Sequence, residues 1–280
     1  MLKRKLFYLL PSSWRPLARQ IYYWPIDLWD RILGRRDSYT PPKGKIFVGS
    51  GDFKEEGHRT LEFLKLWAGM RPSHQVLEVG CGIGRKAVPL IGYLNPDSGG
   101  SYDGFDIVKK GIKWCQKNIS RTHPHFTFIH ADIANDLYNK QGHISGTEFM
   151  FPYSDGSFDL VFLTSVFTHM PDTEVAHYMA EISRVLRPGG KLFITWFIWN
   201  NETERLHKEG LTDKQFPWDK SHYRLMDKNI ESANVAYNEE WILHLYHKFG
   251  FSIISPIHYG WWRGINKQND YQDTIVAQKN

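Results

Sequence analysis

The stretch VLEVGCGIGR, residues 76–85, carries the strongest structural signal in this chain. A mostly apolar run precedes three glycines at alternate positions, Gly80, Gly82 and Gly84. Glycines after a strand let the backbone turn sharply and approach a ligand, and a following helix presents free N–H groups to an anion. The stretch therefore predicts a strand, a ligand-binding turn and a helix N-terminus. By itself it leaves open whether the ligand is a dinucleotide or a smaller cofactor.

Strands and helices are predicted to alternate around this turn. Such alternation argues for a parallel sheet with helices on both faces. The last two predicted strands are joined by a linker too short for a helical crossover, so we expect that pair to be antiparallel. The predicted strands are 76–79, 101–106, 126–132, 158–167, 191–199, 251–260 and 271–279, and the predicted helices are 55–68, 85–93, 109–119, 172–186 and 238–250.

The net charge of +5 is concentrated at the N-terminal end. Residues 1–37 hold eight lysines and arginines and three acidic residues, and the remaining residues are balanced. We therefore expect no nucleic-acid partner, because no basic face extends over the domain. No apolar run approaches the ~20 residues that a membrane span needs, and residues 1–14 lack the features of an export signal. With only Cys81 and Cys115, we expect a cytoplasmic protein with neither disulfides nor a metal site.

Composition divides the chain into an N-terminal extension, residues 1–40, and a main domain, residues 41–280. The extension is basic, aromatic and broken by prolines, and residues 24–36 fit a short amphipathic helix. Such a segment favours either peripheral contact with an anionic membrane surface or packing on the domain. Residues 200–238 form a long polar stretch with scattered aromatic residues. Long connections of this kind are usually lids or binding elements, so we expect a lid-like insert for the substrate.

Two acidic residues follow predicted strands on the ligand side of the sheet. Asp106 lies 22 residues after Gly84, where a carboxylate can accept both hydroxyls of a ribose. Asp132 ends the third predicted strand, where its carboxylate could accept from the amine of an adenine. Each aspartate could also cap the segment that follows it, because aspartate is a good N-cap, and at Asp106 capping does not exclude ribose binding. At Asp132 we favour the ligand contact.

Five motifs in this order resemble those of class I S-adenosylmethionine-dependent methyltransferases. They are VLEVGCGIGR, YDGFDIV, FIHADI, FPYSDGSFDLVFLTSVFTHM and EISRVLRPGGKLFIT. The resemblance covers residues 55–200 well and the final helix and strand pair loosely. It implies an α/β, Rossmann-like, doubly wound seven-stranded sheet with an antiparallel last strand. It also implies S-adenosyl-L-methionine as the cofactor.

The resemblance assigns the cofactor contacts residue by residue. The turn after the first strand would border the methionine half, Asp106 would hold the ribose, and the end of the third strand would hold the adenine. Thr164 and Ser165 would line the sulfonium side. The implied cofactor-binding residues are Glu78, Gly80, Cys81, Gly82, Gly84, Asp106, Ile107, Asp132, Ile133, Thr164 and Ser165.

Arg85 and Lys86 depart from the family pattern, because small residues are common after the third glycine. We expect both side chains to point outward along the helix. The methionine carboxylate suits the turn and the helix N-terminus, whereas the sulfonium is a cation and disfavours nearby lysine or arginine.

Methyl transfer to a hydroxyl also needs a base that removes a proton. His169, in the segment SVFTHMP, follows the fourth predicted strand on the ligand side and is the first candidate for this catalytic role. Its alternative role is to tie down the loop in which it lies. His222, Tyr223 and His258 are weaker candidates for the base.

Aromatic residues gather in and around the insert and in the C-terminal loop. Aromatic faces stack on flat rings or on the C–H faces of sugars, although such residues also pack cores. We expect a small-molecule or glycan-like acceptor that is methylated on oxygen. The alternatives are an NAD-dependent oxidoreductase of the same fold, or a non-catalytic cofactor-binding scaffold held at membranes by residues 1–40. The aromatic residues are Trp196, Trp199, Phe216, Trp218, Tyr223, Tyr237, Trp241, Tyr259, Trp261 and Trp262.

Overall fold

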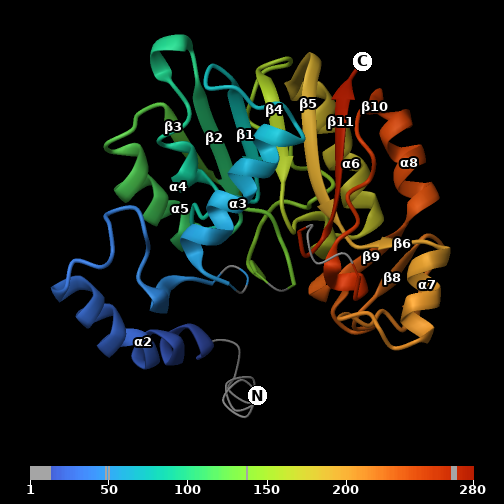
Figure 1. The fold of residues 1–280 in the computed structure, drawn as a ribbon, viewed down its shortest axis with the longest axis horizontal. Coiled ribbons are helices and arrows are strands. Elements are labelled where there is room, and N and C mark those ends of the chain that lie inside the picture. Colours follow the sequence, from blue (N-terminus) through green and yellow to red (C-terminus); the bar gives the residue numbers. More distant parts are fainter. Residues whose placement is uncertain (1–13, 48, 50, 137, 266–269) are drawn as a thin grey trace.

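A seven-stranded sheet lies at the centre of the molecule, with helices on both faces (Figure 1). The computed structural model describes residues 14–47, 49, 51–136, 138–265 and 270–280. The strand order is β10-β11-β5-β4-β1-β2-β3. β1 to β5 run parallel and β11 is antiparallel to both β5 and β10, which confirms the predicted sheet and its antiparallel last strand. The strands are β1 (Gln75–Val79), β2 (Ser101–Asp106), β3 (Phe126–His130), β4 (Phe158–Leu163), β5 (Leu186–Trp196), β10 (Phe251–Ile253) and β11 (Asp273–Lys279).

Each face of the sheet packs against its own helices through a separate apolar core. Leu64 of α3 and Ile112 of α5 belong to one core, and Met179 of α6 belongs to the other. Neighbouring residues of β1 divide between them, Val76 to the first and Leu77 to the second, as the pleat of a strand requires. The helices are α3 (Phe53–Leu66), α4 (Ala87–Leu90), α5 (Lys109–Cys115), α6 (Asp172–Val185) and α8 (Glu239–Lys248).

Several predicted elements differ in extent from the structure: β10 ends at Ile253 rather than at residue 260, and β4 ends at Leu163 rather than at residue 167. α4 spans only four residues of the predicted helix at 85–93, because Pro89 has no N–H to donate to the helical ladder. β5 begins at Leu186 rather than at residue 191. The Pro-Gly-Gly segment after α6 is thus part of β5 and lies beside β4. The pairing of β4 with β5 shifts register between Phe158 and Leu160, as it does at a β-bulge.

The insert at 200–238 contributes to a second, four-stranded sheet and is not a long loop. The strand order is β6-β9-β8-β7, and β6 follows β5 after Phe197, so this sheet continues from the end of the first (Figure 1). Its strands have two to four residues each, too few for a hydrophobic period to reveal them. Phe197, Phe216 and Trp262 pack its core. The elements are β6 (Ile198–Trp199), α7 (Asn201–Lys208), β7 (Trp218–Asp219), β8 (Tyr223–Leu225) and β9 (Val235–Asn238).

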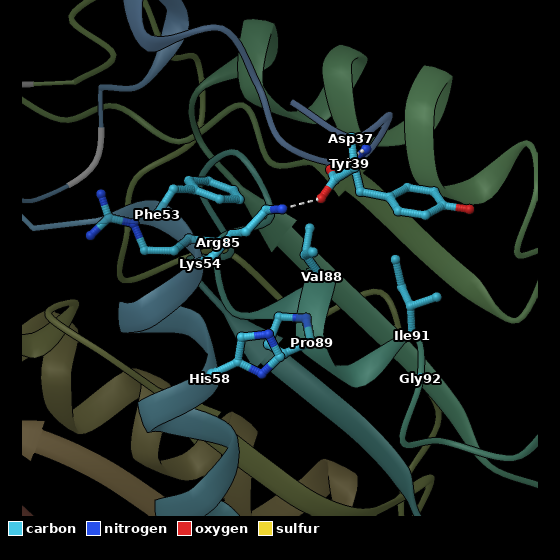
Figure 2. A pocket seen from close by; sticks show the side chains of 10 residues that line it. All are labelled: Asp37, Tyr39, Phe53, Lys54, His58, Arg85, Val88, Pro89, Ile91 and Gly92. Carbon is cyan, nitrogen blue, oxygen red and sulfur yellow. Dashed lines mark hydrogen bonds and ion pairs between the residues drawn. The ribbon is translucent and has the colours of Figure 1, made fainter. Parts of the chain in front are cut away.

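The N-terminal extension contains one long helix, α2 (Arg15–Ile32), which extends further toward the N-terminus than the predicted segment at 24–36. Residues 1–13 of the predicted extension lie outside the described residues. The end of the extension packs on the domain, where Asp37 pairs with Lys54 at 2.6 Å. Figure 2 shows Asp37 and Tyr39 beside α3 and α4, at a cavity of about 310 Å³. No helix in the described ranges is long and apolar enough to cross a membrane.

Asp273, fully buried at the start of β11, joins the two sheets. Its carboxylate accepts hydrogen bonds from the backbone N–H groups of Ile198 and Gly260, both at 2.7 Å, and from the Trp262 indole at 2.8 Å. Burial raises the pKa of Asp273 to about 7, although the three donors favour its charged form. One carboxylate therefore satisfies three buried donors from β6 and from the C-terminal loop.

We expect Asp273→Ala to lower the free energy of unfolding by about 3 kcal/mol or more, because it leaves three buried donors without an acceptor. Urea denaturation measures this change. Asp97→Ala, at an exposed position, should change the stability by no more than about 0.5 kcal/mol. Equal, small effects of the two substitutions would contradict the linking role of Asp273.

Candidate active site

A cavity of about 730 Å³ opens at the carboxyl ends of β1, β2 and β4. Open α/β sheets bind ligands at this edge. Its wall also includes residues of the insert and residues just before β11. The predicted site residues that line it are Glu78, Gly80, Cys81, Gly82, Asp106, Ile107, Ile133, Thr164, Ser165 and His169.

The glycine turn after β1 is fastened to β2. The N–H groups of Gly80 and Cys81 both donate to the carbonyl of Phe105, at 2.9 and 3.1 Å. Gly80 has φ +77°, and a Cβ there would lie 2.5 Å from a methyl group of Val166. Gly84 is not among the lining residues: it also has a positive φ, and a Cβ there would face the Cys115 thiol. Gly84 thus shapes the turn from behind the cavity.

Asp106 braces the turn from the end of β2. Its carboxylate accepts hydrogen bonds from the N–H groups of Gly82 and Val108, both at 2.7 Å. Burial raises the pKa of Asp106, and these two donors oppose that shift. No side chain caps the N-terminus of α5. Asp106 therefore does not act as the helix N-cap that the sequence also allowed. A carboxylate has about four lone-pair sites, and two of them remain for a ligand.

Glu78 is a buried carboxylate at the cavity wall. The hydroxyl of Tyr102 donates to it at 2.5 Å. Burial raises the pKa of Glu78 to about 8, against the smaller effects of the Tyr102 hydrogen bond and of Lys86. Near neutral pH this side chain is therefore mostly protonated, and a cation in the cavity would favour its charged form.

Asp132 and Ile133 occupy different positions after β3. Ile133 is buried and lines the cavity. Asp132 is not among the lining residues, and its carboxylate meets the His143 ring at 2.6 Å. The segment that follows Ile133 contributes Asn135 and Tyr138 to the wall instead. The structure therefore brings Ile133, and not Asp132, together with the other predicted site residues.

Thr164 and Ser165 line the cavity just after β4. Ser165 is the one residue other than glycine with a positive φ in the described ranges, at +58°. Its N–H donates to Thr195, and its hydroxyl donates to Gln272 at 2.7 Å. Strained backbone of this kind clusters at binding sites, and here Thr195 of β5 and Gln272 before β11 hold it.

His169 also lines the cavity, from the short helical turn Phe167–His169. Its Nδ1 lies 2.7 Å from the carbonyl of Ser232. A carbonyl can only accept, so Nδ1 carries the proton and Nε2 is the basic nitrogen. Burial lowers the pKa of His169, against two backbone hydrogen bonds.

The three weaker candidates for the base lie away from this wall. His222 pairs with Asp172 at 2.6 Å, and His258 stacks on Trp67 with ring centres 3.8 Å apart. Tyr223 belongs to β8 of the second sheet. None of the three is among the cavity-lining residues.

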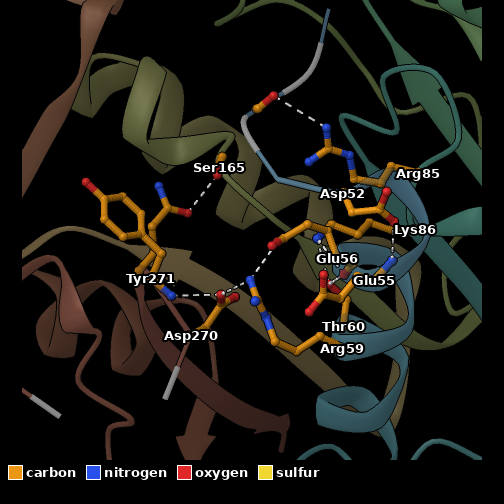
Figure 3. Close-up of polar contacts among 12 residues, drawn as sticks. Asp52, Glu55, Glu56, Arg59, Thr60, Arg85, Lys86, Ser165, Asp270 and Tyr271 are labelled. Carbon is orange, nitrogen blue, oxygen red and sulfur yellow. Dashed lines mark hydrogen bonds and ion pairs between the residues drawn. The ribbon is translucent and has the colours of Figure 1, made fainter. Parts of the chain in front are cut away.

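Charged residues of α3 and of the turn form part of the wall, contrary to one expectation. Arg85 is buried, and Lys86 lines the cavity and donates to the Thr60 hydroxyl at 2.6 Å. The prediction that both point outward is wrong, since α4 packs its N-terminal end against α3. Figure 3 shows Arg59 between Glu56 and Asp270, to which it donates at 2.6 and 3.1 Å.

Arg59, Glu56 and Asp270 were not expected at the site, although all three line the cavity. No sequence motif identifies them, because Asp270 lies 211 residues after Arg59 in the chain. Only their opposite charges could have drawn attention to them. Two carboxylates face the single guanidinium of Arg59, so these three side chains leave one negative charge in excess.

Comparison with known proteins agrees with this geometry. A family model described as a methyltransferase domain matches residues 77–194, which run from β1 through most of β5. The matched segment is that of a class I S-adenosylmethionine-dependent methyltransferase. The matched range contains the glycine turn, Asp106, the end of β4 and His169.

Two curated proteins are similar to about half of this chain. A phthiotriol/phenolphthiotriol dimycocerosates methyltransferase of Mycobacterium ulcerans is 34% identical over 145 residues, 52% of this chain and 44% of that protein. A sterol 24-C-methyltransferase of Schizosaccharomyces pombe is 28% identical over 49% of this chain and 32% of that protein. The matches thus span less than half the length of these relatives.

A solved structure shares the fold over most of the chain. It is magnesium protoporphyrin IX methyltransferase from Synechocystis PCC 6803 with bound SAH, at 18% identity and a TM-score of 0.50. The match covers 94% of this chain and 99% of that chain. Neither of the two curated relatives is named as an oxidoreductase, so these two matches give the NAD-dependent alternative no support.

We expect Gly80→Ala to lower the free energy of unfolding by about 3 kcal/mol, through the left-handed backbone and the contact with Val166. Adding Val166→Ala to Gly80→Ala removes the contact with Val166 but not the strain of the left-handed backbone. The double variant should therefore be more stable than the sum of the two single effects predicts, by about 1 kcal/mol or more. Gly92→Ala is the control, because a Cβ there meets nothing within 4 Å. Strict additivity in urea denaturation would contradict the close approach.

Proposed function

We propose that this chain transfers a methyl group from S-adenosyl-L-methionine to a small-molecule acceptor. The observation that carries the proposal is one cavity of about 730 Å³ that brings together the glycine turn, Asp106, Glu78 and His169. In a member of this family, these groups stand where a cofactor and an acceptor would have to meet. A chain that only bound the cofactor would not need a basic nitrogen at the same wall.

The residues of the cavity fit this cofactor from end to end. Glu78 offers a buried carboxylate to the cationic amino group, and the turn at Gly80–Gly82 approaches the amino-acid half. Asp106, beside Ile107, has acceptor capacity left for ribose hydroxyls. Ile133 offers an apolar contact to the adenine. For Asp132 to accept from the adenine amine, its carboxylate would have to exchange the His143 ring for the ligand.

The protein mainly has to align the donor with the acceptor and exclude water. Bound S-adenosyl-L-methionine would supply an electrophilic methyl carbon on a positively charged sulfur. Thr164 and Ser165 line that side of the pocket without adding a cation. The Arg59 guanidinium in the α3 wall is paired with the carboxylates of Glu56 and Asp270, which more than offset its charge.

We propose oxygen as the acceptor atom, with His169 as the general base. Its Nε2 is the basic nitrogen, and the Ser232 carbonyl holds the ring in place. As the acceptor oxygen bonds to the methyl carbon, its proton would pass to Nε2. A neutral imidazole suits this role, and the lowered pKa of His169 keeps it neutral near pH 7.

The acceptor is proposed to be a small or glycan-like molecule that the insert helps to cover. Lys214 and Asn234 of the insert line the cavity, as does Trp261 of the C-terminal loop. The names of the two curated relatives support a small acceptor, although the sterol enzyme is named for a carbon position. Most of the other aromatic residues noted above serve the cores: Trp196, Trp199, Phe216, Tyr237 and Trp262.

A cytoplasmic location is also proposed. Cys81 and Cys115 are both free and buried, which fits a reducing compartment. Among the described residues, no cluster of three or more His, Cys, Asp and Glu side chains could hold a metal ion. The proposed chemistry assigns every step to the cofactor and to side chains of the cavity.

We expect the chain to bind S-adenosylhomocysteine and to release a proton from Glu78 as it does so. Glu78 is protonated below a pKa of about 8, and the ammonium of the ligand favours the carboxylate. Affinity should therefore rise as the pH increases toward 8. Isothermal titration at pH 7 in buffers of different ionisation enthalpy measures the proton release.

Glu78→Gln keeps an acceptor for Tyr102 but has no proton to release. Its affinity should be about tenfold lower at pH 8, and its heat independent of the buffer. Glu62→Gln, at an exposed position of α3, should behave as the wild type. Absence of binding at millimolar ligand would overturn the cofactor assignment, and buffer-independent heat in the wild type would overturn the role of Glu78.

We expect His169→Gln to lower kcat about a hundredfold, since general bases contribute roughly 10² to 10⁴ in rate. Binding of S-adenosylhomocysteine should stay within about twofold, because the base acts on the acceptor. Transfer of labelled methyl to a small-molecule extract measures the rate. His177→Gln is the control, because His177 bonds the Phe149 carbonyl away from the cavity. Wild-type turnover by His169→Gln would exclude it as the base.

A further inference from the structure

The helix α2 has its polar side toward the main domain. Asp27 accepts hydrogen bonds from the backbone N–H groups of Lys43 and Gly44, at 2.6 and 3.0 Å. Asp30 pairs with the ammonium of Lys43 at 3.1 Å, and Arg19 donates to the carbonyl of Lys43. Polar contacts with residues 43–45 therefore hold the helix in place.

The apolar side of α2 is exposed over the described part of the chain. A surface helix of a globular protein normally buries its apolar stripe and exposes its polar face, so α2 is inverted. Trp24 and Ile21 are about two-thirds exposed, at 65% and 66%. Their spacing repeats every three or four residues, which places them on one broad face. The exposed apolar residues are Trp14, Leu17, Ile21, Tyr22, Trp24, Ile26, Leu28, Trp29, Ile32 and Leu33.

A contiguous apolar face of this kind marks an interaction site, and its charge identifies the occupant. Residues 1–37 hold the entire net charge of +5, and Arg31 and Arg35 are exposed at the end of the helix. Tryptophan and tyrosine beside arginine settle at the headgroup level of bilayers, and basic residues are attracted to anionic lipids. A second copy of this face would instead bring like charges together.

α2 lies at the same end of the molecule as the cavity. Figure 1 shows it below the sheet, whereas the C-terminus, at the end of the antiparallel β11, lies at the top. The carboxyl ends of the parallel strands therefore face the side on which α2 lies. The chain that follows residues 43–45 leads from α2 to the cavity, because Phe47, Gly49 and Gly51 line it.

We propose that α2 is an interfacial membrane helix whose apolar face lies in the headgroup region of an anionic bilayer. Its polar face and residues 43–45 attach the domain to it, with the cavity end toward the lipid. The docking does not depend on methyl transfer, so a chain without activity would still bind membranes. If the proposed transfer also occurs, the position of the cavity favours an acceptor that partitions into the bilayer.

Sedimentation of the full chain with vesicles tests the docking. We expect binding to vesicles of phosphatidylcholine with phosphatidylglycerol, weaker binding to phosphatidylcholine alone, and a decrease with added salt. The double variant Trp24→Glu/Trp29→Glu should lose at least about tenfold in partitioning to both. The double variant Arg31→Gln/Arg35→Gln should lose about thirtyfold on the anionic vesicles only.

Leu66→Glu is the matched control, because Leu66 is 77% exposed on α3, and it should bind as the wild type. All substituted positions are exposed, so thermal unfolding midpoints should be unchanged. The proposal is overturned if the wild type stays in the supernatant or if the tryptophan variant sediments as the wild type does. It is also overturned if ultracentrifugation without vesicles shows a dimer that the tryptophan variant dissociates while vesicle binding is absent.

Discussion

The carboxylate of Asp106 holds the glycine turn against the end of β2, and the site is arranged around this contact. It accepts from Gly82 in the turn and from Val108 ahead of α5. The Phe105 carbonyl adds two further bonds to the same turn. Because the turn is fixed from two sides, its backbone can border the cavity without a side chain to fill it. The left-handed φ at Gly80 and Gly82 follows from this arrangement.

Burial then determines the electrostatics of the cavity. Glu78, Asp106 and Lys86 all carry shifted pKa values for which desolvation is the largest cause. A cationic ligand binds favourably to a site that raises the pKa of a carboxylate in this way, because the cation stabilises the ionised form of that carboxylate. In the adjacent wall, Arg59 pairs with two carboxylates, so these three side chains leave one negative charge in excess. These features fit a ligand that carries both an ammonium and a sulfonium.

Two additions to the common fold meet at the cavity end. The second sheet follows β5 and is joined to β11 through Asp273, so the insert is built on secondary structure that is attached to the main sheet. The extension places α2 at the same end, with its polar face toward the domain. Both elements therefore lie near the cavity end while the seven-stranded sheet keeps the family arrangement.

The sequence by itself determined the alternation of strands and helices, the glycine turn and the antiparallel last strand. These features depend on residues close together in the chain, such as apolar runs, glycine spacing and a short final linker, so they can be read locally. The same holds for Asp106 and Thr164, which follow strands whose ends are bound to meet at one edge.

Only the tertiary structure decided which side chains meet. It paired Asp132 with His143, turned Lys86 toward Thr60, and placed Asp270 beside Arg59. It also folded the insert as a sheet and gave α2 its inverted orientation. In each case the outcome depends on partners far apart in the chain or on strands too short to show a period. Local patterns determine the type and order of the main elements, whereas their exact bounds, burial and partners are set by the packing of the whole chain.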